Sequence, residues 1–426
     1  MRYITTILAA LLLTGSITRA QSLEECHALA REHYPEIKKF GLINKAKEYN
    51  LSNAARAWIP QISLSGQATY QTATPTYPEA FSNIMAASGV DMTGIRKDQY
   101  KVTIDINQNI WDGGISNAER AKAEAEAAEQ QSRLEVSLYD LETRVDDIYF
   151  GILLLQERVA QAETLTGILE ENLEKMRAYH RNGTATQADV DAVEAELLTT
   201  KQSLEQAKSS KASYRRILEL FIGKPLERER LERPALQEVT TRVSARPELD
   251  LFDSQEQQAN AQLKAINASL MPRFSAFAQG YYGYPGLDMF HSMRTTEWTL
   301  NAIVGVRMSW NIGAFYTREN NIGKLNTTKQ QIALQRDIFL FNTRISVEQQ
   351  DGEINRLKRA IEDDNRIVEL RRSVRKAAES QLGNGVIDTS ELLKKIAEET
   401  AAEQNRSTHE IELLQAIYRL KNTLNQ

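Results

Sequence analysis

The residues that most often carry catalytic chemistry are sparse and scattered in this sequence. None of the five histidines belongs to an HExxH metal motif or stands beside a nucleophile motif, and no glycine-rich phosphate loop precedes a helical pattern. These histidines are His27, His33, His180, His291 and His409. We therefore predict that the chain is not an enzyme, that it has no catalytic residue, metal site or cofactor, and that any transport draws energy from another protein.

Soft metal ligands occur in both loops that join the predicted strands of a pair. Met289, His291 and Met293 lie in the loop between the last two predicted strands, and Met85 and Met92 lie in the corresponding earlier loop. Thioether and imidazole groups suit copper or silver. Exposed loops also collect such residues by chance, so we assign no metal site and keep these metals only as an alternative for the cargo.

The first twenty residues have the layout of a cleavable secretory signal. Arg2 is followed by an apolar run from Ile7 to Leu13 and by Ser-Ile-Thr-Arg-Ala at 16–20, so the mature chain is expected to start at Gln21. The net charge is −5 with the leader included, and the leader contributes only basic charge. This balance argues against a nucleic-acid partner. The single cysteine, Cys26, is expected to be a packed thiol.

The spacing of the prolines reveals an internal duplication. Pro35 is followed 25 residues later by Pro60, and Pro247 is followed 25 residues later by Pro272. We therefore predict two copies of one unit, at 21–225 and 246–426, joined by a linker at 226–245. Each unit is expected to run helix, strand, loop, strand, very long helix, tight turn and returning helix.

Apolar residues alternate steps of four and three along the long helix of the first unit, which is the seam of a coiled coil. This helix is expected from about Ser116 to about His180, on the order of 100 Å at about 1.5 Å per residue. Helices about half as long flank it, one from Leu23 to about Trp58 and one ending near Gly223. The second unit repeats the pattern at about 247–271, 314–382 and 389–425. The seam residues are Leu134, Leu138, Leu141, Val145, Ile148, Ile152, Leu155, Val159, Ala162, Thr166, Leu169, Leu173 and Met176.

Four stretches alternate apolar and polar residues and are predicted as strands, at about 61–73, 100–111, 273–284 and 298–310. Alternation alone fits a small soluble sheet with one buried face as well as a membrane barrel. The tryptophans favour the barrel, because each lies within a few residues of a strand end, where an interfacial girdle would place it. They are Trp58, Trp111, Trp298 and Trp310.

A membrane barrel would require more than one copy of the chain. After the leader no stretch of about 18 apolar residues follows, so a membrane would be crossed by strands. Four strands cannot close a barrel, and open strand edges are not tolerated in hydrocarbon. Several chains must then share one barrel, and the residues alone do not fix their number.

Taken together, the leader, the duplicated units, the strand pairs and the glycine-containing turns resemble the TolC family of outer-membrane efflux proteins. The segments of this sequence that carry the resemblance are specific as an ordered set, and they span nearly the whole mature chain. They are Ala-Arg-Ala-Trp-Ile-Pro-Gln-Ile-Ser-Leu at 55–64, Asn-Ile-Trp-Asp-Gly-Gly at 109–114, Arg-Pro-Glu-Leu at 246–249, Val-Gly-Val-Arg-Met-Ser-Trp at 304–310, and the turns at 181–190 and 383–392.

The resemblance implies a mostly α fold with transmembrane β structure. It implies a homotrimer, in which a 12-stranded β-barrel continues into a 12-helix α-barrel that crosses the periplasm. It also implies export of drugs, metals, dyes or proteins through the outer membrane of a Gram-negative bacterium. The implied partners are outer-membrane lipid, a periplasmic adaptor protein and an inner-membrane pump, in a tripartite efflux or type I secretion system.

The resemblance also assigns roles to the two glycine-containing turns. They would be the periplasmic tips that meet the adaptor, although Asn-Gly is a common tight-turn pair whatever it touches. The candidate contact residues are Asn182, Gly183, Thr184, Asn384, Gly385 and Val386.

Carboxylates just beyond the turns line the closed aperture in the family, and the matching positions here are Asp189 and Glu391. A ring of such carboxylates would attract cations and raise the pKa of each member. Asp189 could equally be a helix N-terminal acid and nothing more. Where the best-known members have a second acid, this chain has Lys394, and Leu382 and Ile387 replace a tyrosine and an arginine of the closing network.

A periplasmic coiled-coil scaffold with a small β-domain and no transport role is the alternative. The strands discriminate between the two, because a barrel needs detergent for extraction and a scaffold does not.

Overall fold

The computed structural model describes residues 22–90, 92, 94–226, 230–236, 239 and 241–426. The expected leader at 1–20 and part of the expected linker at 226–245 lie outside the described residues. The chain divides into two compact units. We call Phe40–Ser132 with Leu251–Gln335 the sheet unit, and the residues up to Lys39 with Arg133–Asp250 and Arg336–Gln426 the tip unit.

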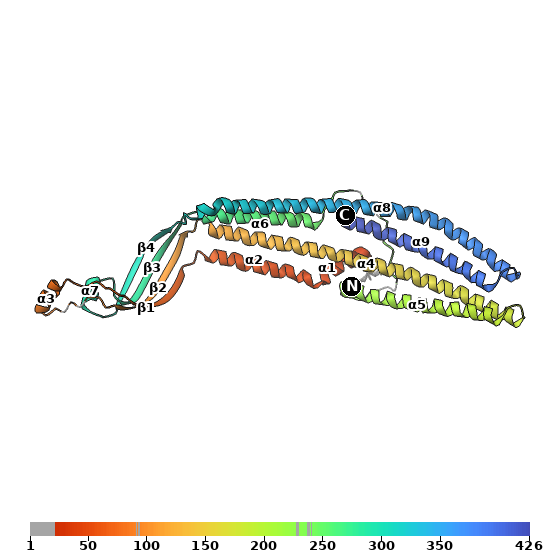
Figure 1. The fold of residues 1–426 in the computed structure, drawn as a ribbon, viewed down its shortest axis with the longest axis horizontal. Helices are drawn as coiled ribbons and strands as arrows, with labels where there is room; N and C mark the ends of the chain where they lie inside the picture. Colours follow the sequence, from red (N-terminus) through yellow and green to blue (C-terminus); the bar gives the residue numbers. More distant parts are fainter. Residues whose placement is uncertain (1–21, 91, 93, 227–229, 237–238, 240) are drawn as a thin grey trace, which may run out of the picture. The chain divides into compact units, whose positions relative to one another are not determined.

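The sheet unit contains one antiparallel sheet in the order β1-β2-β3-β4 (Figure 1). Its strands are β1 (Gln61–Tyr70), β2 (Asp98–Trp111), β3 (Arg273–Tyr284) and β4 (Thr299–Ser309). The first strand was predicted to reach 73 but ends at Tyr70. Pro75 and Pro78 follow closely and lack the N–H group that a ladder needs. The connection from β1 to β2 carries the short helix α3 (Glu79–Ala87), and that from β3 to β4 carries α7 (Met289–Arg294).

Five long helices account for most of the remaining chain. They are α4 (Ile115–Arg181), α5 (Gln187–Ile222), α6 (Pro247–Ser269), α8 (Ala314–Gly383) and α9 (Thr389–Leu424). The described part of the linker between α5 and α6 forms no helix or strand. No described helix is both long and apolar enough to cross a membrane.

The expected single helix from Leu23 to about Trp58 is interrupted. The structure has α1 (Leu23–His33), a 3₁₀ turn η1 (Pro35–Lys38) and α2 (Lys39–Arg56). Tyr34 has an extended backbone (φ −61°, ψ 128°). A residue before proline is driven out of the α region, and proline cannot donate to the preceding turn, so the helix stops there.

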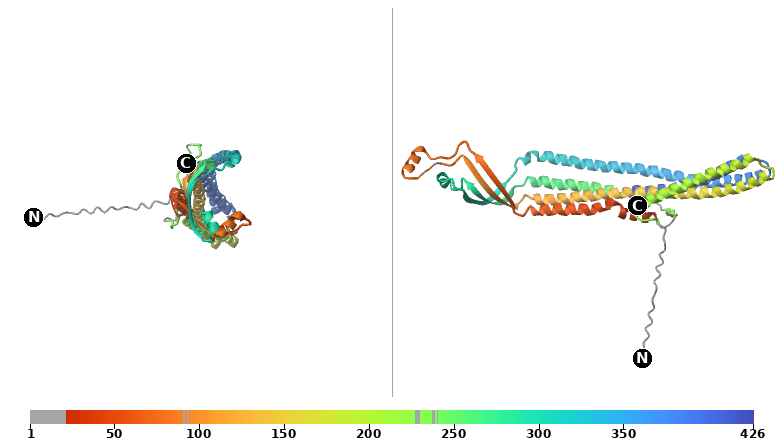
Figure 2. Two further views of the ribbon diagram at one scale, coloured as in Figure 1. Left: turned by 90° about the vertical axis from the view of Figure 1, so that its left-hand side faces the viewer. Right: turned by 90° about the horizontal axis from the view of Figure 1, so that it is seen from below.

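The tip unit is held together by the seam of α4. No residue of the predicted seam is exposed, and Leu138, Val145, Ile152 and Leu169 are fully buried. Near its end α4 packs on α5 through a cluster of Leu169, Leu173, Met176, Val190, Val193 and Leu197. Two views show that the α4–α5 and α8–α9 turns lie at the same end of this unit (Figure 2).

A polar network is buried in the tip unit around Asp146. Asp146 is 2% exposed and lies 2.6 Å, oxygen to nitrogen, from the His27 Nε2. Its second oxygen accepts a hydrogen bond from the Asn422 side chain. This carboxylate therefore joins α1, α4 and α9.

Candidate functional sites at the tips and on the sheet

The two tips have the same backbone geometry. Gly183 and Gly385 have φ angles of 74° and 70°, the left-handed region. The N–H of Thr184 donates to the Tyr179 carbonyl and that of Val386 to the Gln381 carbonyl, both at 2.9 Å. Each long helix thus ends in a glycine C-cap with a six-residue closing bond. All six predicted tip residues are exposed: Asn182, Gly183, Thr184, Asn384, Gly385 and Val386.

Replacing Gly183 with alanine should destabilise the tip by about 1–2 kcal/mol, because a Cβ is disfavoured at positive φ. Its surroundings are open, so no steric clash adds to the effect. Gly167 lies within α4, also in open space, and is the matched control. There the same substitution should stabilise by about 0.5–1 kcal/mol. The thermal unfolding midpoints of both variants measure the difference. Shifts in the same direction for the two variants would contradict the left-handed conformation assigned to Gly183.

Asp189 serves as a helix cap in this structure. Its carboxylate accepts hydrogen bonds from the Thr186 N–H at 2.9 Å and the Thr186 hydroxyl at 2.6 Å, and together they form a capping box at the start of α5. The hydrogen bonds from the Thr186 side chain and backbone lower the pKa of Asp189, and the Thr389 hydroxyl adds to this. The capping role that the sequence left open for Asp189 is therefore present in the single chain. The lowered pKa of Asp189 is opposite to the raised pKa expected for a member of a carboxylate ring.

Glu391 is placed differently from Asp189, although both are the third residue of their helix. Its carboxylate pairs with Lys395 at 3.1 Å, and its backbone N–H is capped by Asp388 at 2.8 Å. Lys394 is exposed. Asp388 is a further carboxylate at this tip that our sequence reasoning missed. Its position as a helix N-cap, equivalent to Thr186 in the first unit, was the signal that could have revealed it.

Charged residues join α8 to α9 just behind the second tip. Glu399 is 7% exposed and pairs with Arg375 and, at 3.4 Å, with Arg372. Arg371 pairs with Glu398 at 2.5 Å and Arg372 with Glu403 at 2.6 Å. The second hairpin therefore combines apolar contacts with an ion-pair network. This network could not be predicted from spacing along either helix alone. Ion pairs also join α4 to α5 in the first hairpin, such as Lys201 with Glu170 at 2.8 Å.

The two tips pack against each other through apolar residues. Leu382 contacts both the α4–α5 cluster and a smaller one of Ala378, Leu392 and Ile396, and Ile387 contacts the smaller one. The Thr389 hydroxyl lies 3.5 Å from the Met176 sulfur. Leu382 and Ile387 stand where the resemblance implies a tyrosine and an arginine of a hydrogen-bond network, and both make apolar contacts instead.

The sheet has one apolar face and one polar face. The ladder aligns Ile62, Ile106, Ala278 and Val304 in one row across all four strands. The next row, on the opposite face, is Ser63, Asp105, Gln279 and Ile303, in which Gln279 donates to Asp105 at 2.6 Å. We call the side containing Val304 the apolar face. It is uncovered in the single chain, where Leu300 is 82%, Val304 77% and Leu64 72% exposed.

The four predicted interface tryptophans are partly exposed and lie toward the ends of the strands. Trp111 packs on Phe274 with ring centroids 6.0 Å apart, and Trp298 packs on Tyr282 at 5.4 Å. The Trp310 indole N–H donates to the Leu270 carbonyl at 2.9 Å. Trp58 precedes β1 and is 44% exposed. Each tryptophan has an apolar ring at the surface, as an interfacial girdle requires.

Among the described residues, no group of three or more His, Cys, Asp or Glu side chains could hold a metal ion. In the second outer loop, the His291 Nε2 lies 3.2 Å from the Thr295 hydroxyl, and Met289 is exposed. This geometry gives the methionine-containing loops no specific support as a metal site.

Residues 28–224 match the family model described as outer membrane efflux protein. This part, a little under half of the chain, belongs to the outer membrane efflux protein family. This confirms the family predicted from the sequence, and membership supports a channel role in efflux rather than an enzymatic one. None of the curated proteins compared with the chain matches its sequence.

Solved structures of outer-membrane channels share the fold of this efflux family member. VceC from Vibrio cholerae aligns with a TM-score of 0.67 and 15% identity, over 94% of this chain and 95% of its own. CmeC from Campylobacter jejuni gives 0.65 and 12% identity, over 94% and 85%. MtrE from Neisseria gonorrhoeae, solved in an open state, gives 0.64 and 14% identity, over 94% and 88%. At these identities the likeness concerns the fold, which is mostly helical with one small sheet.

Proposed function

We propose that this chain is one subunit of a homotrimeric outer-membrane duct that exports its cargo passively. The observation that carries this proposal is the uncovered apolar face of the sheet. Burying a row such as Ile62, Ile106 and Val304 in lipid removes it from water, at about 25 cal/mol per Å² of apolar surface. The polar side chains of the opposite face would line a water-filled lumen.

The strand order supports closure by several copies. In the described sheet β1 and β4 are the two edges. Because an even number of antiparallel strands ends in a strand opposite in direction to the first, β4 of one copy meets β1 of the next as an antiparallel pair. Lipid cannot satisfy open edges, so a ring is required. The family resemblance favours three copies, and hence twelve strands.

A second surface on α8 also fits contact between copies. Leu334, Ile338, Phe341 and Ile345 follow one another at steps of four, three and four. Their side chains are 59%, 50%, 62% and 42% exposed in that order. A seam at this spacing is the partner surface of a coiled coil. Its burial by a neighbouring copy would extend the barrel into a helical tunnel.

The proposed duct works with other proteins. It has no energy source of its own, so we propose that a periplasmic adaptor and an inner-membrane pump deliver the cargo, in a tripartite efflux or type I secretion system. The exposed tips from Asn182 to Thr184 and from Asn384 to Val386 are the proposed adaptor contacts. Localisation to the outer membrane, with the helices in the periplasm, follows from the same proposal.

We further propose that Asp189, Glu391 and Lys394 lie around the periplasmic aperture. Glu391 is the strongest candidate for an effect on ions, because its carboxylate pairs with the long side chain of Lys395 on its own helix. Asp189 is committed to its capping box. The net charge at the aperture would then depend on how many of these groups face the opening.

Glu391→Gln should lower the preference of the channel for cations by roughly two- to fivefold. A unit charge about 4 Å from a passing ion in water contributes about 1 kcal/mol. The substitution also removes one of two carboxylates that pair with Lys395 and leaves Glu398, at 3.6 Å. Single-channel reversal potentials in a salt gradient measure the change. Glu369, exposed on α8 and paired with Arg366, provides the control Glu369→Gln. Equal selectivity in wild type and Glu391→Gln would remove this residue from the aperture.

A further inference from the structure

Cations outnumber acids on the polar face of the sheet, the side that contains Asp105. Side chains alternate between the two faces of a strand, and this face holds the odd-numbered residues of β1, β3 and β4, and those of β2 up to Asn109. The charged residues among them, all of which the structure describes, are Lys101, Asp105, Arg273 and Arg307. The face therefore carries a net positive charge in a chain whose net charge is −5.

Two of these cations lie at the end of the sheet nearest α6 and α8. Arg273 is the first residue of β3 and aligns with Ser309, and Arg307 of β4 aligns with Ser275. The two arginines are thus diagonal neighbours on adjacent strands, with Cα atoms about 7–8 Å apart. Both residues are exposed. We call them the arginine pair, because one anion at the surface of the sheet can contact both guanidinium groups.

An aromatic ring supports one guanidinium of the arginine pair. The guanidinium carbon of Arg307 lies 4.8 Å from the centroid of the Phe277 ring, which is a cation–π contact. Phe277 is opposite Gly305 in the ladder, and a Cβ added at Gly305 would lie 2.9 Å from a carbon atom of that ring. The ring therefore lies across the glycine. This contact occupies one flat side of the Arg307 guanidinium and leaves its N–H edge open to a ligand.

The one acid of the polar face does not neutralise the arginine pair. The Asp105 carboxylate accepts a hydrogen bond from the Gln279 side chain at 2.6 Å. Along β2, Asp105 is four residues from Asn109, which shares a row with Arg307, so the two rows are about 14 Å apart. Within the described residues, neither Arg273 nor Arg307 has a side-chain hydrogen bond or ion pair.

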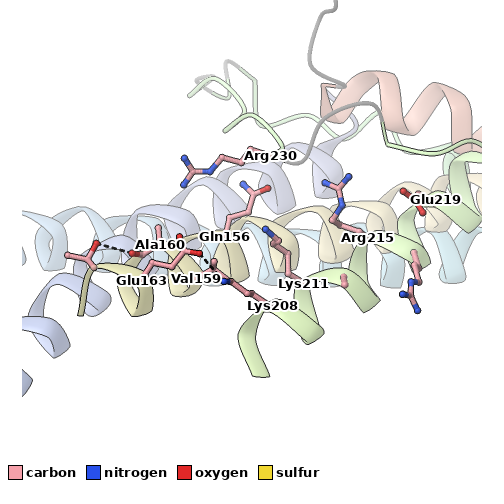
Figure 3. Close-up of a pocket in the computed structure, with 12 residues that line it drawn as sticks. Gln156, Val159, Ala160, Glu163, Lys208, Lys211, Arg215, Glu219 and Arg230 are labelled. Carbon is pink, nitrogen blue, oxygen red and sulfur yellow. Dashed lines mark hydrogen bonds and ion pairs between the residues drawn. The ribbon is translucent and has the colours of Figure 1, made fainter. Parts of the chain in front are cut away.

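Other basic clusters of the chain are interleaved with acids. In the cleft between α4 and α5, Lys208 pairs with Glu163 at 3.2 Å (Figure 3). Behind the second tip, Arg372 and Arg375 both pair with Glu399. The arginine pair differs from these clusters, because its charges are left to water or to a ligand.

A neighbouring copy would not supply the missing acid either. In the proposed ring, the strand that pairs with β4 is β1 of the next copy. The polar-face residues of β1 are all uncharged, so this holds for any register between the two strands. They are Gln61, Ser63, Ser65, Gln67 and Thr69. The arginine pair therefore keeps its charge when the barrel closes.

We propose that the arginine pair binds a carboxylate or phosphate group of the cargo on the wall of the duct. This inference rests on the proposed trimeric duct, in which the polar face lines the lumen and three arginine pairs form a ring. Guanidinium groups form paired hydrogen bonds with both kinds of anion. A site in a pore must also release what it binds, and the exposure of both arginines to water keeps the anion exchangeable. The favoured cargo is therefore anionic.

The test is the block of single channels formed by the full-length protein in a planar bilayer, in about 0.1 M KCl, where charges act over about 10 Å. Citrate and inorganic tripolyphosphate are added separately, in the compartment opposite the one that received the protein. The barrel end of the duct faces that compartment, because the long helices are too polar to cross the bilayer. We expect a saturable fall in conductance with at least one probe. The tighter blocker identifies carboxylate or phosphate as the preferred group.

Removing either arginine should weaken the block. Arg273→Gln and Arg307→Gln should each raise the half-blocking concentration at least about tenfold, since a hydrogen bond to a charged group contributes at least about that factor. Phe277→Leu keeps both charges but removes the ring beside Arg307, and should raise the half-blocking concentration by roughly two- to fivefold. Conductance of each variant in KCl without a probe checks that the channel still assembles.

Lys101→Gln is the matched control, because it removes one cation from the same polar face. Along β2, Lys101 is eight residues from Asn109, so its row is about 27 Å from that of Arg307. The half-blocking concentration should stay within about twofold of wild type. Channels that neither probe blocks, or equal shifts in Lys101→Gln and Arg307→Gln, would overturn the arginine site and leave the duct standing. Absence of any channel would overturn the duct, and the site with it.

Discussion

Val304→Arg should prevent the protein from assembling in the outer membrane. Val304 lies in the middle of β4, and its side chain is 77% exposed on the apolar face. An arginine facing lipid at the bilayer midplane costs about 2–4 kcal/mol, and in the proposed trimer each copy bears this cost. The measurement is the amount of protein in outer-membrane fractions, relative to wild type.

Ile303→Arg is the control for this substitution, because its site is the preceding residue and points to the opposite face. Ile303 shares a row with Gln279, Asp105 and Ser63 on the polar side. An arginine there would meet water in the lumen, so assembly should stay close to wild type. Equal loss of assembly in both variants would contradict the orientation of the sheet.

Asp146→Ala should lower the free energy of unfolding by roughly 3–5 kcal/mol, as expected when one partner of a buried ion pair is removed. The substitution leaves His27 and the Asn422 amide without their acceptor. Asp147→Ala is the matched control. Asp147 is about half exposed and pairs with Arg419 at 2.9 Å, so its loss should cost under about 1 kcal/mol. Guanidinium unfolding followed by the helical circular dichroism signal measures both.

The same pair predicts a pH dependence. Burial alone would lower the pKa of His27, but the hydrogen bond and charge of Asp146 outweigh it and raise the pKa above its usual 6.5. The stabilisation is therefore complete below about pH 6.5 and is lost as the pH rises through the raised folded-state value. Unfolding midpoints of wild type should fall over this window, and those of Asp146→Ala should not. A fall of equal size in both would assign the pH dependence to other groups.

Much of the secondary structure can be read from the sequence, because long elements repeat a simple period. The four-and-three spacing of α4 marks the buried side of a helix that begins at Ile115 and ends at Arg181. Strand positions follow from the change to a period of two. The interruption at Tyr34 shows the limit of such reasoning, since Pro35 was visible in the sequence, yet one helix was expected from Leu23 to about Trp58.

The sites depend more on tertiary geometry. The glycine turns are local, so the positive φ at Gly183 and Gly385 follows from the residues themselves. Ion pairs such as Arg375 with Glu399 depend on the rotation of α8 against α9, which spacing along one helix does not give. The hydrogen bonds between Gln156 and the Leu231 backbone likewise require the linker to return onto α4.

The central claim, that several copies complete one membrane duct, is tested most directly by the mass of the protein after detergent extraction. Cells are fractionated, outer membranes are washed with high salt without detergent, and the extracted protein is analysed by light scattering corrected for bound detergent. The account predicts that the protein stays with the membrane until detergent is added and then has the mass of three mature chains. Release into the salt wash as a monomer would contradict it and would favour the coiled-coil scaffold.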